Sequence, residues 1–303
     1  MSLNNPHNTQ SIPTPDDLHQ LKMQAKDLLR SLHYHRQLDR LMVLPEKDRR
    51  PPWKLHQTQH IIALECGFKS WRKLKEFCEQ AASVRFQPSL TEIRSSEPSD
   101  ETIYRVRQHM AAIGYVVIEQ FFDRDKTQEI RTLCEKVLTQ KNKKTSAIPY
   151  ELLFRHPFKS IIRDRYIHAL LQAILKSNDL RLKKMSIGIR SLRPANRVTQ
   201  RVHRDTSQKD HQPLIAYDVM LTQFTYKNGA TEIWPGTHIT HEAPDQIRIE
   251  RERISKTPCH QLKGPEGSVI LRNAHLWHRA GTNRSQHDRY LLSLGSWYKA
   301  KVT

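Results

Sequence analysis

The first third of the chain places apolar residues at helical spacing. Over residues 16–32 they recur every three or four positions, which predicts an amphipathic helix with an acidic cap. A second helix is predicted over residues 56–66, and a third begins after Ser70, a favourable capping residue. These helices predict a small all-α module over residues 16–83, preceded by a flexible N-terminus, residues 1–15.

The pattern changes after this module. Residues 84–100 are rich in serine, proline and charged side chains, which favours a linker. Helices are then predicted over residues 101–112, 125–140 and 163–176, and a short apolar run at residues 115–121 predicts a strand between the first two. The second domain is therefore expected to begin with flanking helices.

From residue 185 onward the chain reads mainly as strands. Residues 185–192 and 197–205 are predicted to pair, residues 214–226 form a further strand, and Gly267 restarts the sheet after a polar excursion. Many antiparallel-looking strands behind a group of helices are typical of a jelly-roll, the double-stranded β-helix of cupin-like proteins. The predicted fold class is thus α+β, with this domain spanning residues 101–303.

Composition narrows the class of protein. No apolar run approaches the ~20 residues that a membrane-spanning helix needs, and the N-terminus has no charged and apolar regions of a secretory signal. Four cysteines are scattered without a CxxC pair, which suits free thiols in a reducing compartment. We therefore expect a cytoplasmic protein without a membrane span.

The net charge of +19 is concentrated in the second domain. Residues 1–100 hold 15 of the 50 basic and 12 of the 31 acidic residues, so the remainder carries +16. Such a field attracts anions, including nucleic acid, nucleotides and CoA esters. A basic surface without a dedicated anionic partner explains the same excess.

Candidate chemistry centres on His203 and Asp205. Side chains two apart on a strand point to the same face, so this imidazole and this carboxylate are expected to project together. Two histidines and one carboxylate on one face of an octahedron form the site of non-haem Fe(II) oxygenases. His-x-Asp alone arises by chance, and two polar residues facing solvent would explain it equally.

A third ligand is expected from far along the chain. The apolar run beginning at Gly267 ends in two candidates, His275 and His278. Arg289 opens the next apolar strand, where a charge is costly unless it is paired. A planar guanidinium binds a carboxylate through two parallel hydrogen bonds, so Arg289 suits a dicarboxylic acid.

These residues carry a resemblance to a known family. The matching pieces, in chain order, are Gly114-Tyr-Val-Val-Ile118, His203-Arg-Asp205, Asn228-Gly-Ala-Thr-Glu-Ile-Trp-Pro-Gly-Thr-His238, and His278 followed by Asn283, Ser285 and Arg289. Over roughly residues 101–303 the chain resembles the phytanoyl-CoA dioxygenase family of Fe(II)/2-oxoglutarate-dependent oxygenases.

The resemblance implies roles for individual residues. It selects His278 over His275, giving His203, Asp205 and His278 as iron ligands and as the catalytic site, and it assigns Arg289 and Met185 to 2-oxoglutarate. Together with O2, these cofactors would hydroxylate an unactivated C–H bond and release succinate and CO2. Related halogenases carry glycine or alanine in place of the aspartate, so the aspartate favours hydroxylation. Ala280 departs from the family, which often has a serine there.

The substrate stays open at this point. A small molecule, anionic or not, is the first expectation, and an oxygenase acting on RNA or protein is an alternative. A basic, nucleic-acid-associated jelly-roll without turnover is another, and a metal cupin of different chemistry, such as an isomerase, is a further one. On the helical module, His56 and His60 are four apart, but no third ligand is placed beside them.

Overall fold

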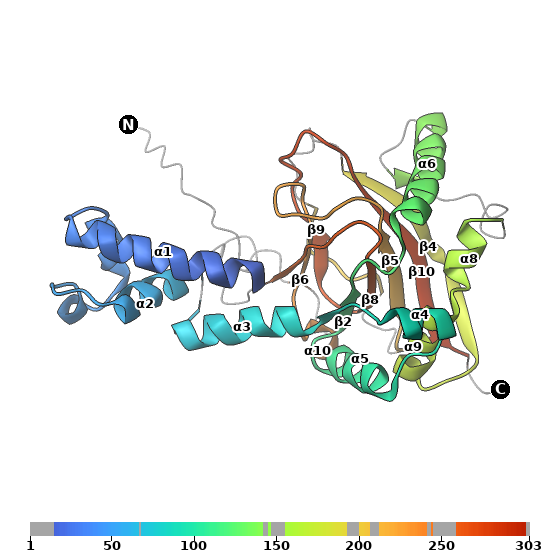
Figure 1. Cartoon of the computed structure of the whole chain (residues 1–303), viewed down its shortest axis with the longest axis horizontal. Helices are drawn as coiled ribbons and strands as arrows, with labels where there is room; N and C mark the ends of the chain where they lie inside the picture. The colour runs from blue at the N-terminus through green and yellow to red at the C-terminus, as the bar shows by residue number, and fades with distance from the viewer. Residues whose placement is uncertain are drawn as a thin grey trace. The chain divides into compact units, whose positions relative to one another are not determined.

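Figure 1 shows a computed structural model of the chain, which divides into two compact units, Met1–Ser83 with Ile247–His260 and Val84–Gln246 with Gln261–Thr303. The structure describes residues 15–66, 68–141, 145–146, 155–192, 200–206, 212–240, 244 and 259–300. Within these ranges the side chains of residues 15–17, 20, 138–141, 145–146, 184–192 and 240 are not described. The predicted flexible N-terminus lies almost entirely outside the described residues.

The first unit is helical over its described residues up to Ser83. Its elements are α1 Pro15–His33, the 3-10 turns η1 Leu38–Val43 and η2 Glu46–Asp48, α2 Leu55–Glu65 and α3 Trp71–Ser83. The three predicted helices are therefore present. Their apolar sides form one buried cluster that includes Leu28, Ile61, Ile62, Leu74 and Cys78. The amide of Lys73 donates to the hydroxyl of Ser70 at 3.3 Å, as expected for a helix cap.

The segment predicted as a linker contains two short elements. It forms β1 Arg85–Phe86, which pairs in parallel with β2, and α4 Leu90–Ser95. Val84 is buried beside β1, and its carbonyl accepts from the amide of Val117. The hydroxyl of Ser89 caps α4. Non-local pairing thus orders a stretch whose composition alone indicates coil.

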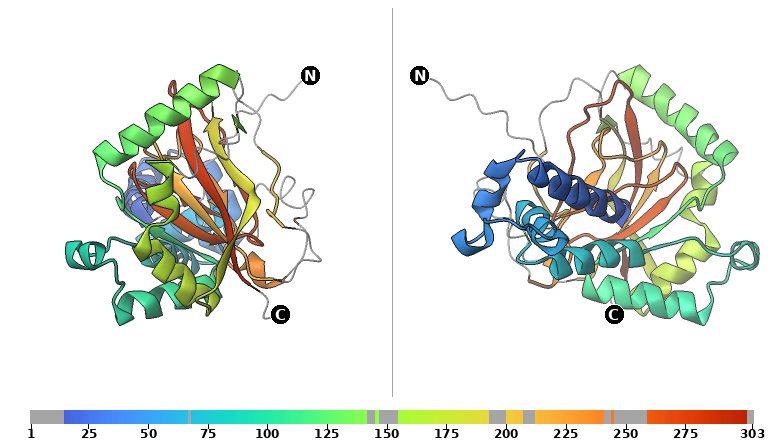
Figure 2. Two further views of the ribbon diagram at one scale, coloured as in Figure 1. Left: turned by 90° about the vertical axis from the view of Figure 1, so that its right-hand side faces the viewer. Right: turned by 60° about the vertical axis from the view of Figure 1, so that its left-hand side comes forward.

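Helices of the second unit cover one face of a large sheet (Figures 1 and 2). They are α5 Asp100–Ala112, α6 Arg124–Lys141, α8 Phe158–Ile162 and α9 Arg165–Leu175. The predicted helices over residues 101–112, 125–140 and 163–176 correspond to α5, α6 and α9, whereas α8 was not predicted. The apolar residues of these helices pack on every second residue of the strands, and those strand residues form the outer face of the sheet.

In the described part of the chain, seven strands form the large sheet, in the order β1-β2-β8-β5-β10-β4-β3. Beyond β1, the strands in that order are β2 Tyr115–Ile118, β8 Val269–Asn273, β5 Ile215–Met220, β10 Arg289–Lys299, β4 Leu180–Leu192 and β3 Thr145–Ser146. All neighbours except β1 and β2 pair antiparallel.

A second sheet of three described strands has the order β7-β6-β9. Its members are β7 His260–Leu262, β6 Thr231–Ile233 and β9 His278–Ala280, and the short helix α10 Thr237–Thr240 follows β6. The turn before β6 needs glycine, because Gly229 has a φ of +78° and a Cβ there would lie 2.4 Å from the carbonyl oxygen of Gly281. The two sheets form the predicted jelly-roll, and its interior is lined by apolar residues of both.

Two strand predictions need correction. The strand expected over residues 214–226 ends at Met220, where the chain bends. The strand expected over residues 197–205 is, in its described part, a single antiparallel bridge at His203. Most of the polar excursion that follows α10 lies outside the described residues. No helix in the described ranges combines the length and the apolar character needed to cross a bilayer.

Candidate metal centre

Backbone pairing brings His203, Asp205 and His278 together. The two histidines face each other in the bridge, and each amide donates to the other's carbonyl at 3.0 Å. The amide of Asp205 donates to Ala274 at 3.0 Å. As a result, Nε2 of His203 and Nε2 of His278 lie 3.8 and 3.5 Å from Oδ1 of Asp205. All three ligand atoms lie within 4.8 Å of one another.

The hydrogen bonds of the two imidazoles fix which nitrogen carries the proton. Nδ1 of His203 lies 3.0 Å from the carbonyl of Arg201, and Nδ1 of His278 lies 2.9 Å from the carbonyl of Leu276. A carbonyl only accepts, so each Nδ1 donates and, in the neutral ring, each Nε2 keeps a lone pair. Nε2 of His278 is buried and has no hydrogen-bond partner in the structure. Two lone pairs and a carboxylate oxygen thus converge, which fits a divalent cation such as Fe(II).

Asp205 is held by an arginine on the opposite side of its carboxylate. Oδ2 lies 2.6 Å from Nη2 of Arg272, and the Asp205 side chain is 18% exposed. Burial by itself raises the pKa of Asp205, but the positive charge of Arg272 and its hydrogen bond outweigh it and hold that pKa well below its usual value. The carboxylate is therefore ionised and able to bind a cation.

Arg272 belongs to a buried polar network on the inner face of the large sheet. Its Nε lies 3.0 Å from Oδ2 of Asp218, whose Oδ1 accepts from the hydroxyl of Ser293. Burial alone would lower the pKa of Arg272, but the two carboxylates raise it above its ordinary value. The sequence patterns considered above did not predict this network. The signal was an arginine inside the apolar strand Val269–Asn273, the same rule that selected Arg289.

Arg289 also lies on the inner face. It is the first residue of β10 and only 1% exposed, and it shares the face of Ser293 because the two are four residues apart on a strand. The guanidinium carbon lies 4.2 Å from the centre of the Phe224 ring, a cation–π contact that fixes the plane of the charge.

The turn before β10 is organised by Asn283. Its Oδ1 accepts from the amide and the hydroxyl of Ser285, at 2.9 and 2.7 Å, and its Nδ2 donates to the carbonyl of His287 at 2.8 Å. Asn283 is itself buried. The Asn-x-Ser spacing of the sequence motif therefore serves the turn that leads into Arg289.

The other histidines considered lie outside the cluster. His275 is held by Thr206, whose hydroxyl lies 2.8 Å from Nδ1, and by the carbonyl of Gln212, 3.3 Å from Nε2. His238 is buried against Gly114, where an added Cβ would lie 2.6 Å from Nδ1. On α2, His56 and His60 are joined by no third metal-ligating side chain in the described ranges.

Two further sequence candidates, Met185 and Ala280, lie on different strands. Met185 lies in β4, and its side chain is outside the described residues. Ala280 lies in β9, and its amide donates to the side-chain oxygen of Gln200 at 3.0 Å.

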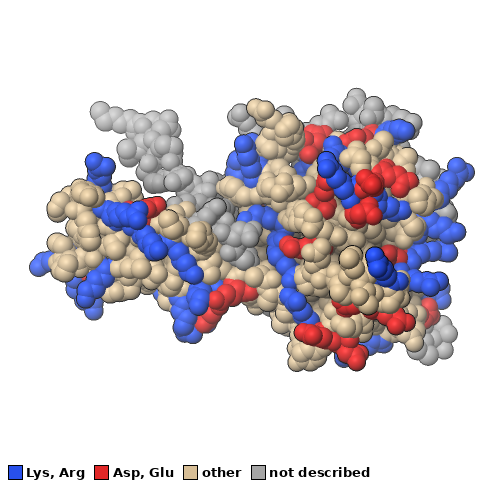
Figure 3. Space-filling view, in the orientation of Figure 1, with Lys and Arg blue, Asp and Glu red and all other residues tan. Residues whose placement is uncertain are grey.

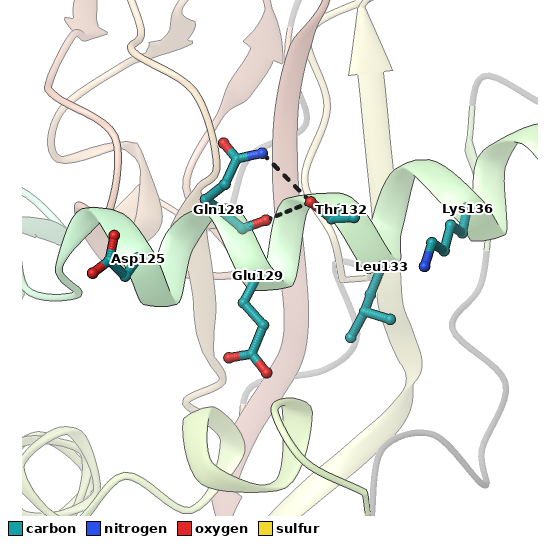
Figure 4. A pocket seen from close by; sticks show the side chains of 6 residues that line it. All are labelled: Asp125, Gln128, Glu129, Thr132, Leu133 and Lys136. Carbon is teal, nitrogen blue, oxygen red and sulfur yellow. Dashed lines mark hydrogen bonds between the residues drawn. The ribbon is translucent and has the colours of Figure 1, made fainter.

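A surface groove of about 460 Å³ lies along α6 (Figure 4). Its lining residues are Asp125, Gln128, Glu129, Thr132, Leu133 and Lys136. None of them belongs to the metal-ligand cluster, and Gln128 and Thr132 bond to each other. The groove therefore contributes nothing to the site at His203.

Comparisons with known proteins agree with this fold. The non-haem α-ketoglutarate-dependent epimerase SnoN from nogalamycin biosynthesis superposes with a TM-score of 0.55 at 18% identity, covering 67% of this chain and 82% of SnoN. The carbocyclase SnoK from the same biosynthesis gives 0.53 at 16% identity, covering 67% and 85%. EvdMO1 gives 0.51 at 15% identity, covering 66% and 50%. At these identities the likeness shows a common fold.

The barrel and the two-histidine, one-carboxylate cluster define the class as a cupin-like oxygenase. The family model described as phytanoyl-CoA dioxygenase matches residues 111–291, more than half of the chain, so the chain belongs to the phytanoyl-CoA dioxygenase family. It is a 2-oxoglutarate-dependent oxygenase whose cofactors are Fe(II), 2-oxoglutarate and O2.

Proposed function

We propose that the enzyme hydroxylates an unactivated C–H bond of a small molecule and converts 2-oxoglutarate to succinate and CO2. The observation that carries this proposal is that two imidazole lone pairs and the ionised carboxylate of Asp205 face one common point. A carboxylate at this position occupies the place that a halide would need, which favours hydroxylation over halogenation. Iron supplies the oxidative chemistry when bound, and the protein orients and shields the reactants.

The proposal assigns a role to each of these residues. His203, Asp205 and His278 hold the iron on one face and leave three positions of an octahedron open. Arg289, fixed on the Phe224 ring, holds the far carboxylate of 2-oxoglutarate inside the barrel. Met185 is proposed to contact the same cosubstrate from β4.

Charge balance supports this set of partners. Asp205 and Asp218 carry two negative charges, and Arg272 and Arg289 carry two positive charges, so the four side chains sum to zero. Fe(II) and the dianion of 2-oxoglutarate also sum to zero. Loading the site therefore adds no net charge to a buried region, which avoids the cost of an uncompensated buried ion.

A small-molecule substrate is proposed because SnoN has been solved with Fe3+, α-ketoglutarate and nogalamycin RO. An anionic small molecule is the first kind of substrate to test. The second domain carries the excess of positive charge, and Arg201, which is exposed, is two residues from His203. On the face seen in Figure 3, basic side chains are interspersed with acidic ones.

The test is succinate release from 2-oxoglutarate by the full chain with Fe(II) and O2, screened against small molecules with and without an anionic group. We expect one class of compounds to raise succinate release and to gain one oxygen atom by mass. The His278→Ala variant is the matched control and should show neither. Succinate release that no compound stimulates, or a product without added oxygen, would refute the hydroxylase proposal.

A further inference from the structure

We propose that Arg272 is a positioning residue that keeps Asp205 bound to iron through one oxygen only. This inference rests on the proposed function, since it takes Asp205 as an iron ligand. Arg272 lies on β8, six residues before His278. Its ion pairs are with Asp205 and Asp218, and neither involves a histidine. Its effect on the iron would therefore act through Asp205.

The two oxygens of Asp205 face different partners. Oδ1 lies within 3.8 Å of both imidazole Nε2 atoms, whereas Oδ2 lies 2.6 Å from Nη2 of Arg272. A short, charge-assisted hydrogen bond of this kind competes with metal binding at Oδ2. If Oδ2 also bound the iron, it would take one of the three positions that 2-oxoglutarate and O2 need together.

Arg272 is itself fixed by a second layer of the inner face. Asp218 on β5 accepts from its Nε at 3.0 Å, and Ser293 on β10 donates to Asp218. In the sheet register Ser293 pairs directly with Asp218. Three adjacent strands thus set the plane of the guanidinium, and with it the rotation of the Asp205 carboxylate. A lysine offers one nitrogen and cannot reproduce this fork.

The obvious variant, Arg272→Met, leaves Asp218 buried without its cation and is expected to fold poorly. The informative variant is therefore the double change Arg272→Met with Asp218→Leu, which removes both charges from the core. Replacing a buried ion pair with apolar residues of similar volume is often neutral for stability. Asp205 keeps contact with water, because its side chain is 18% exposed. Arg272→Lys serves as the second variant, since it keeps the charge.

The experiment measures Fe(II) affinity of the metal-free full chain by anaerobic titration, together with thermal unfolding. Removing the group that orients a metal ligand typically weakens metal affinity about 10–100-fold. We expect this loss in Arg272→Lys and in the double variant, because the Asp205 carboxylate is then no longer oriented toward the two imidazoles, although the double variant unfolds near the wild-type temperature. The 2-oxoglutarate charge-transfer band should also need more cosubstrate to form, because one position is contested.

A matched control is Arg279→Met. Arg279 is next to His278 and pairs with Glu232 at 2.6 Å, but it contacts none of the proposed ligands. The Fe(II) affinity of the Arg279→Met variant should equal that of the wild type. Wild-type Fe(II) affinity in a well-folded double variant would overturn the inference, since Arg272 would then serve stability alone. Equal Fe(II) affinity of wild type and His278→Ala would instead refute the proposed function itself.

Discussion

The two faces of the large sheet are equally buried but differ in chemistry. On β5, the outward residues Tyr217 and Val219 pack against helices, whereas Asp218 between them points inward and holds Arg272. On β10, Leu292 and Ser293 show the same contrast. An apolar residue at the inward positions would stabilise the fold at lower cost. The difference teaches that the buried polar positions of the inner face serve the site, whereas the outer face is apolar throughout these strands and serves stability.

The largest effect should come from substituting a proposed metal ligand, since the polar inner face of the large sheet supports these ligands through Arg272. His278→Ala removes an imidazole whose Nε2 has no other hydrogen-bond partner in the structure, so turnover should be lost. Fe(II) affinity and succinate release measure this. The residue is 3% exposed, so a circular-dichroism spectrum must show that the variant is folded.

The converse change removes an apolar side chain from the outer face of the large sheet. Leu292→Ala, at a fully buried position of the apolar core, should cost about 2–5 kcal/mol of unfolding free energy. Chemical denaturation measures this, and Fe(II) affinity of the folded protein should stay at the wild-type value. A variant that keeps its stability but loses iron would contradict the division between the two faces.

A smaller effect is expected from Arg289→Ala. Hydrogen bonds to a charged group are worth about 1.5–3 kcal/mol, so the KM for 2-oxoglutarate should rise roughly 10–100-fold. Arg284→Ala is the control, because Arg284 is exposed and stacks on Tyr226. An unchanged KM in the Arg289 variant would refute its assigned role.

The smallest effect is expected from the aromatic ring that contacts Arg289 on the inner face. Phe224→Leu removes the ring below Arg289 and should raise the KM for 2-oxoglutarate about 2- to 30-fold, from a cation–π contact of about 0.5–2 kcal/mol. The same change at Phe121, which packs in the outer core, should leave that KM unaltered. Equal KM values for the two variants would show that the ring does not position Arg289.

Much of this could be predicted from local patterns. The helices follow from apolar spacing. The two-residue spacing of His203 and Asp205 predicts that their side chains project together, and in the structure their ligand atoms and that of His278 lie within 4.8 Å of one another. Arg272 and Asp218 were missed because they come from strands more than 50 residues apart in the chain and meet only through sheet register. Val84 and β1 were missed for the same reason, since their partner strand is remote.

The most direct measurement is an anaerobic titration of 2-oxoglutarate into the Fe(II)-loaded chain, followed by the metal-to-ligand charge-transfer absorption. Our account predicts a saturable band in the wild type and none in His278→Ala, because cosubstrate chelation needs iron held by His203, Asp205 and His278. Absence of the band in iron-loaded wild type, or an undiminished band in His278→Ala, would contradict it.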